Sequence, residues 1–313
     1  MRNLFLFFIA LLLLQNTSAQ DLELQLSSKT LENRNVEISY KKNNPGNFTI
    51  GVKFDNLTNT FQSPESVFSV NGNSGVLITL NPTDKDKGIN YSYQYRYIRG
   101  KLNPKLKENF CYILPYKAGE KVRVVEMGYV NEKYFGAEKQ PDWKSYSIYT
   151  SQQDTVTAIR KGVVVEIVDK FDDKNPASVV YTSEKNYIIV EHEDGTLLKY
   201  SGFERGSITV QLGETVLPGS VLGINAPTQN FNYSISLLLY YLNSADFESL
   251  QGRTLSSPKS LYKILTPKFT FDGSTCDFIE NKKEYTVFNN EEIIMREMSK
   301  KELKKYRASK GDK

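Results

Sequence analysis

The chain has 313 residues, of which 39% are hydrophobic, and is long enough for two domains with a sizeable core. Its 20 Tyr and 17 Phe favour β structure, because aromatic side chains suit half-buried pleated surfaces. The net charge of +4 comes from the C-terminal tail: residues 20–290 carry 31 basic and 31 acidic side chains, which argues against a nucleic-acid partner that would need a concentrated basic face.

Residues 1–19 have the three parts of a secretory signal peptide. Arg2 supplies a positive charge, Leu4 to Leu14 form an uncharged apolar run, and Thr17-Ser18-Ala19 is a small-residue cleavage site. We therefore expect an exported protein, periplasmic or secreted, whose mature chain begins at Gln20. An uncleaved anchor is the alternative. No later stretch is apolar enough for a membrane span, so none is expected after signal removal.

Residues 20–102 are predicted to form a β-sandwich domain. Apolar and polar residues alternate from Phe48 to Phe54 and again from Tyr91 to Tyr97, with turn clusters between such runs. The second run places four tyrosines on one face of a strand. They either form an aromatic platform for a sugar or pack against a partner sheet, and we expect the packed arrangement.

Residues 110–243 are predicted to form a second β-rich domain. Runs at 163–168, 187–190, 197–200 and 234–242 are typical of strands, and a tight turn at residues 193–196 joins two of them. Cys111 and Cys276 flank this domain in the sequence. Because an exported protein meets oxidising conditions, they can form a disulfide.

Residues 244–313 are predicted to be a C-terminal extension that ends in a basic helix. Asn290 can cap this helix, with Glu291 in its first turn and Lys304, Lys305 and Arg307 late in it. The basic end either contacts anionic envelope polymers or is only solvated, and we expect the solvated state.

The second domain resembles the lysostaphin-type zinc peptidoglycan endopeptidases. Four segments carry the resemblance in the order found in that family: 112–119, 158–166, 186–196 and 207–223. The resemblance implies a duplicated hybrid motif β-barrel, so the fold class we expect is mainly β, with an N-terminal β-sandwich, this barrel and a short C-terminal helix.

The zinc ligands of that family are absent from the matching positions. The family holds zinc with a His, an Asp and the second His of a His-x-His strand, whereas this chain has one His in total. Tyr149 stands where the Asp belongs, Gly202 replaces a further His, and Ser234 and Ser236 replace His-x-His. The first His belongs between residues 135 and 140, where none occurs. We therefore expect no metal and no other cofactor.

The sequence contains two other candidates for catalytic residues. Glu138, Asp142 and Asp154 lie near the first lost His, but a site made only of carboxylates would suit Ca²⁺ or Mg²⁺ rather than zinc. The chain's one His, His192, lies in a turn where family members often carry a His that does not bind metal, so we expect a structural role.

The resemblance, with its zinc ligands lost, therefore implies a non-catalytic pseudopeptidase of the cell envelope. We expect it to bind peptidoglycan peptide or to regulate a cell-wall enzyme, with Tyr149, Gly202, Ser234 and Ser236 lining the binding groove. The alternatives are an active metalloendopeptidase with a rebuilt site and an inert structural envelope protein. The sequence does not predict the oligomeric state.

Overall fold

The computed structural model describes residues 23–127, 144–172, 184–228, 232–247 and 261–310. The expected signal peptide with its expected cleavage site before Gln20, and residues 135–140 and Asp142, lie outside these ranges, as does Glu138. The described chain is mainly β with short C-terminal helices, as the sequence predicts. Within these ranges no helix is long and apolar enough to cross a membrane.

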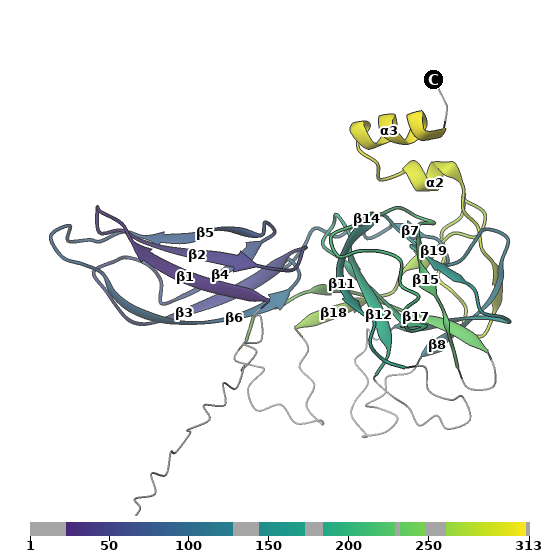
Figure 1. Cartoon of the computed structure of the whole chain (residues 1–313), viewed down its shortest axis with the longest axis horizontal. Coiled ribbons are helices and arrows are strands. Elements are labelled where there is room, and N and C mark those ends of the chain that lie inside the picture. The colour runs from purple at the N-terminus through teal and green to yellow at the C-terminus, as the bar shows by residue number, and fades with distance from the viewer. Residues whose placement is uncertain (1–22, 128–143, 173–183, 229–231, 248–260, 311–313) are drawn as a thin grey trace, which may run out of the picture.

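The N-terminal region is a sandwich of two three-stranded antiparallel sheets (Figure 1). One sheet has the order β1 (Leu24–Thr30), β2 (Val36–Lys42), β5 (Ser74–Leu80), and the other β4 (Glu65–Val70), β3 (Phe48–Thr58), β6 (Asn90–Arg99). Their inner faces enclose one apolar core that includes Leu24, Ile38, Phe48 and Ile50. Alternation along β3 produces this core, because successive side chains point to opposite faces.

The four tyrosines of β6 pack against the sandwich core. Tyr91, Tyr93, Tyr95 and Tyr97 are half-buried against it, and the ring of Tyr97 meets that of Phe48 edge to face at 6.0 Å. The expectation of packing is confirmed, and the aromatic platform for a sugar is not formed by these side chains.

The rest of the chain is built on a ten-stranded antiparallel sheet. Eight strands follow one another in the order β14 (Thr215–Val216), β11 (Gly162–Val168), β12 (Asn186–Glu191), β13 (Leu197–Phe203), β17 (Tyr233–Leu242), β9 (Ser145–Thr150), β8 (Lys121–Met127), β20 (Glu284–Thr286). β16 (Ala226–Pro227) and β18 (Tyr262–Leu265) also pair with β17.

This sheet is open among the described residues, so the expected barrel needs correction. The two ends of the strand order, β14 and β20, do not pair with each other. Both are short, and the ladder stops where they end. Two small strand pairs complete this half: β10 (Thr155–Thr157) with β15 (Val221–Ile224), and β7 (Cys111–Tyr112) with β19 (Lys268–Phe269), which is parallel. The main core includes residues of β7, β10, β15 and β19 together with one face of the large sheet.

Residues after 243 are integrated into this sheet. β18 pairs with β17, and β20 extends the sheet beyond β8. The chain then forms two helices, α2 (Glu291–Met295) and α3 (Lys300–Lys310), at the top of Figure 1. Asn290 caps the first as predicted, with its side chain accepting a hydrogen bond from the Ile293 amide at 2.9 Å.

The expected C-terminal helix is present, but it is divided into two short helices. The helical conformation is interrupted between Met295 and Lys300. Ser299 then begins the second helix with a capping box. The Ser299 amide donates to the Glu302 carboxylate at 2.7 Å, and the Glu302 amide donates to the Ser299 hydroxyl at 3.3 Å. Cys111 and Cys276 form a disulfide with their Cα atoms 5.7 Å apart. This bond joins β7 to the segment that follows β19.

Candidate binding groove

Strand register assembles two rows of side chains on one face of the large sheet. In the first row Arg123 on β8 lies opposite Tyr149 on β9, which lies opposite Ser234 on β17. In the second row Val125 lies opposite Ser147, and Ser147 opposite Ser236.

Period-two alternation explains why these side chains share a face. Val122 and Val124 on β8, Tyr146 and Ile148 on β9, and Ile235 on β17 are buried in the main core. Their neighbours in sequence must point to the other face of the sheet. The same pattern that builds the core therefore places serine, tyrosine and arginine side chains on the opposite surface.

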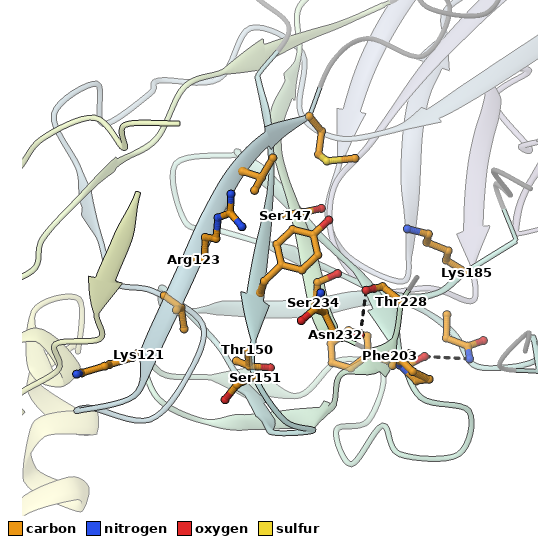
Figure 2. Close-up of a pocket in the computed structure, with 18 of the residues that line it drawn as sticks. Lys121, Arg123, Ser147, Thr150, Ser151, Lys185, Phe203, Thr228, Asn232 and Ser234 are labelled. Carbon is orange, nitrogen blue, oxygen red and sulfur yellow. Dashed lines mark hydrogen bonds between the residues drawn. The ribbon is translucent and has the colours of Figure 1, made fainter. Parts of the chain in front are cut away.

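A groove with a volume of about 780 Å³ lies over this face. Figure 2 shows Lys121 and Arg123 on one strand along one side, Thr228 and Lys185 on the other, and Ser147 and Ser234 between them. Apolar surface also contributes to the lining, from Val122, Val125, Met127, Phe171, Phe203, Ala226 and Pro227.

Three of the four residues expected to line the groove do so. Tyr149, Gly202 and Ser234 are among its lining residues. Ser236 is set back: it does not line the groove, and its hydroxyl lies 2.8 Å from that of Ser147, which does. Ser236 thus supports a groove residue.

Gly202 has a backbone role that the sequence comparison with zinc ligands did not suggest. Asn186 pairs with Phe203 and Tyr187 pairs with Ser201, so Gly202 is the extra residue of a β-bulge. Its φ of +111° is a conformation that side-chain-bearing residues rarely adopt, and a Cβ there would lie 3.0 Å from the Ser234 carbonyl oxygen. Glycine is therefore required at this position by the bulge.

The groove is rich in cations that sequence reasoning missed. It is lined by Lys121, Arg123, Lys185 and Lys282, and none of these forms an ion pair within the described part of the chain. The alternation of Lys121 and Arg123 with buried Val122 and Val124 was a readable signal that both face the same surface. Lys185 and Lys282 come from distant segments and gave no such signal.

Three carboxylates line the same groove. Asp172 is already paired with Arg205, and Glu184 also has an interaction partner. Glu284 lies opposite Arg123 across the β20–β8 ladder and forms no ion pair in the described structure. The groove is therefore electropositive, with more unpaired cations than unpaired anions.

The residues present do not fit a zinc ion. The floor supplies hydroxyl groups from Ser147, Tyr149 and Ser234, whereas zinc sites use imidazole, thiolate and carboxylate ligands. Across the described ranges, no three His, Cys, Asp or Glu side chains gather closely enough to hold a metal ion. Asp154, one of the candidate carboxylates, does not line the groove, and its side chain accepts from the Thr155 amide at 2.6 Å.

His192 is a buried structural residue at the other end of β12 and β13 from Gly202. Its Nδ1 lies 2.8 Å from the Lys161 carbonyl oxygen, so Nδ1 carries the proton, and Nε2 has no partner among the described residues. Burial and the neighbouring Arg160 charge lower the pKa of His192 to about 4. The imidazole is therefore neutral and remote from the groove.

Comparison with known protein families and with curated proteins gives no match. Among solved structures, one similar chain is described as a novel M23 metalloprotease, Pseudoalterin, from deep-sea. It shares 18% sequence identity, and the alignment covers 57% of this chain and 96% of that one with a TM-score of 0.30. This similarity is too weak to define a shared fold.

Proposed function

We propose that this protein is a non-catalytic, peptidase-like protein of the cell envelope that binds a peptide of the cell wall in its groove. The sequence segments that resemble lysostaphin-type endopeptidases support the class, and the signal-like N-terminus supports export. Neither depends on the weak structural similarity described above.

The observation that carries the proposal is the chemistry of the groove floor. Serine and tyrosine hydroxyls can donate and accept hydrogen bonds to a peptide backbone, and the apolar side chains of the wall can contact its side chains. The only imidazole in the chain is buried elsewhere. Of the three lining carboxylates, Asp172 is paired with Arg205 and Glu184 also has a partner. The floor is therefore suited to holding a peptide through hydrogen bonds.

Retention on purified cell-wall sacculi tests the proposal. Val125 is a half-buried residue of the groove floor, so Val125→Trp should fill the groove and abolish retention. The matched control is Val76→Trp, at a position 54% exposed on the sandwich, which should leave retention intact. Gly202 is unsuitable for a bulky substitution because of its positive φ.

Three results would contradict the proposal. Equal retention of both tryptophan variants would remove the groove from the function. Chelator-sensitive digestion of the sacculi, with about one zinc per chain by elemental analysis, would indicate an active metalloendopeptidase instead. Absence of retention with the unmodified protein would leave the inert structural protein as the better description.

A further inference from the structure

We infer that the groove selects an acidic peptide and that Arg123 is the principal anchor for a ligand carboxylate. This inference rests on the proposed function and specifies the class of peptide that the groove binds. It is carried by the charges of Lys121 and Arg123 on β8 and by the hydroxyl groups that β9 and β17 place beside them.

Charge complementarity is the first step. Four cations line the groove without ion-pair partners in the described structure, while Glu284 is the only lining carboxylate that has no partner there. Lys121 and Arg123 lie on the same face of β8, two residues apart, so their charges add along one wall. An anionic ligand would meet a favourable potential, and a cationic ligand would be repelled.

Arg123 occupies the position best suited to bind a carboxylate. Its planar guanidinium presents donors in a fork that matches the two oxygens of a carboxylate. Tyr149 lies directly across the ladder from it, and Ser234 is the next residue in the same row. A carboxylate bound at Arg123 would therefore have hydroxyl donors beside it. On the β20 side of β8, Glu284 lies opposite Arg123 in the ladder, but the two side chains form no ion pair in the described structure. The guanidinium donors of Arg123 therefore remain available to a ligand.

The apolar part of the groove favours a peptide over a phosphate polymer. Val125, Met127, Phe171 and Phe203 line it together with the cations. A phosphate polymer needs a continuous basic track, whereas a peptide places apolar and acidic side chains side by side. Mixed apolar and cationic lining is complementary to the latter.

Titration with two synthetic hexapeptides tests the inference. One alternates Ala and Glu with both ends blocked, and the other has Gln in place of each Glu. We expect the acidic peptide to bind the full-length protein at least about tenfold more tightly, and Arg123→Gln to weaken it about three- to tenfold, the range for a charge-assisted contact that is partly exposed. Added salt should weaken only the acidic peptide.

The matched control is Lys29→Gln, which removes the same charge from an exposed position on β1 of the sandwich. It should leave binding unchanged. If Arg123→Gln fails to fold, Lys121→Gln should reproduce a smaller loss, and the comparison of the two peptides on the unmodified protein still decides.

The inference is overturned if both peptides bind equally, if neither binds, or if Arg123→Gln and Lys29→Gln behave alike. These failures are separable from failure of the proposed function. Sacculi retention that is lost in Val125→Trp would still support wall binding by the groove, even when no preference for acid is found.

Discussion

At the scale of single residues, Arg160 is a buried cation with several partners. It is fully buried, and its guanidinium donates to Asp194 at 2.9 Å, to Glu297 at 2.9 and 3.0 Å, and to the Tyr112 hydroxyl at 3.1 Å. It also stacks over the Phe110 ring with the guanidinium carbon 3.8 Å from the ring centroid. Arg160 therefore joins the β12–β13 turn to the segment between α2 and α3.

We expect Arg160→Met to destabilise the protein by about 3–5 kcal/mol, because it leaves two buried carboxylates without their shared cation. Urea unfolding measures the change. The double variant Arg160→Met/Glu297→Gln should recover part of the loss, since it removes a buried carboxylate that would keep only Lys107 as its ion-pair partner. A cost below about 1 kcal/mol would show that solvent reaches these carboxylates freely.

His192 should make stability depend on pH between about 6.5 and 4. Its pKa is lowered to about 4 in the folded protein, so the unfolded chain, with a pKa near 6.5, takes up the proton first as the pH falls. The stabilisation is complete above pH 6.5 and falls by up to about 3 kcal/mol towards pH 4.

Because the chain has one His, its imidazole signal in an NMR titration is unambiguous. We expect no titration above about pH 5 in the folded protein. The control His192→Asn can keep a donor to the Lys161 carbonyl and should lose the pH dependence in this window. Burial raises the pKa of Asp194 and Glu297, but the hydrogen bonds and charges of their partners, Arg160 among them, outweigh it and lower both pKa values. A midpoint near 6.5 in the folded protein would contradict the buried environment.

At the scale of elements, the disulfide fastens the C-terminal strands to the beginning of the second β-rich region. Cys111 lies in β7, Cys276 follows β19, and these two strands pair in parallel. The bond closes a loop with a sequence separation of 165 residues. The constraint acts mainly on the unfolded chain, which loses conformational freedom.

We expect the double variant Cys111→Ser/Cys276→Ser to lose about 5 kcal/mol of stability in the loop-entropy model. Urea unfolding of the unmodified protein, with and without reductant, provides the comparison, and reductant should leave the double variant unchanged. Thiol titration of the unreduced protein in denaturant should detect no free thiol. Two free thiols in protein purified from its native compartment would contradict the bond.

At the scale of the whole molecule, the sandwich and the large sheet are joined through buried polar contacts. Glu191 accepts hydrogen bonds from the Asn47 amide at 2.7 Å and from the Asn47 side chain. Arg99 bridges Glu23 of the N-terminal region and Glu166 of β11. These contacts are directional and paired, so we expect the two regions to hold one orientation.

Removing one acceptor at this junction should loosen the molecule. We expect Glu191→Ala to cost about 1–3 kcal/mol, because the partly buried Asn47 donors lose their partner, and to broaden the range of orientations of the two regions. Urea unfolding and small-angle scattering measure the two effects. Glu193→Ala is the control, since Glu193 lies two residues away and its side chain is 79% exposed. Identical behaviour of the two variants would show that Glu191 does not hold the regions together.

The sequence by itself determined the faces of the strands and several local features. The alternation in β3, β6 and β8 assigns each side chain to the core or the opposite surface, and Asn290 has the chemistry of a helix cap. The presence of a single His was equally decisive, because a count of imidazoles needs no structure. All of these depend on neighbouring residues or on composition.

Only the tertiary structure decided which strands pair and what their pairing brings together. A period of two specifies a face but not a partner, so the sequence did not predict that β20 would lie beside β8 and bring Glu284 opposite Arg123. It also did not reveal that Gly202 is the extra residue of a bulge, since that depends on its register with Asn186 and Tyr187. The groove arises from these long-range pairings, which is why the contribution of Lys185 and Lys282 to its charge became visible only once the strands were placed.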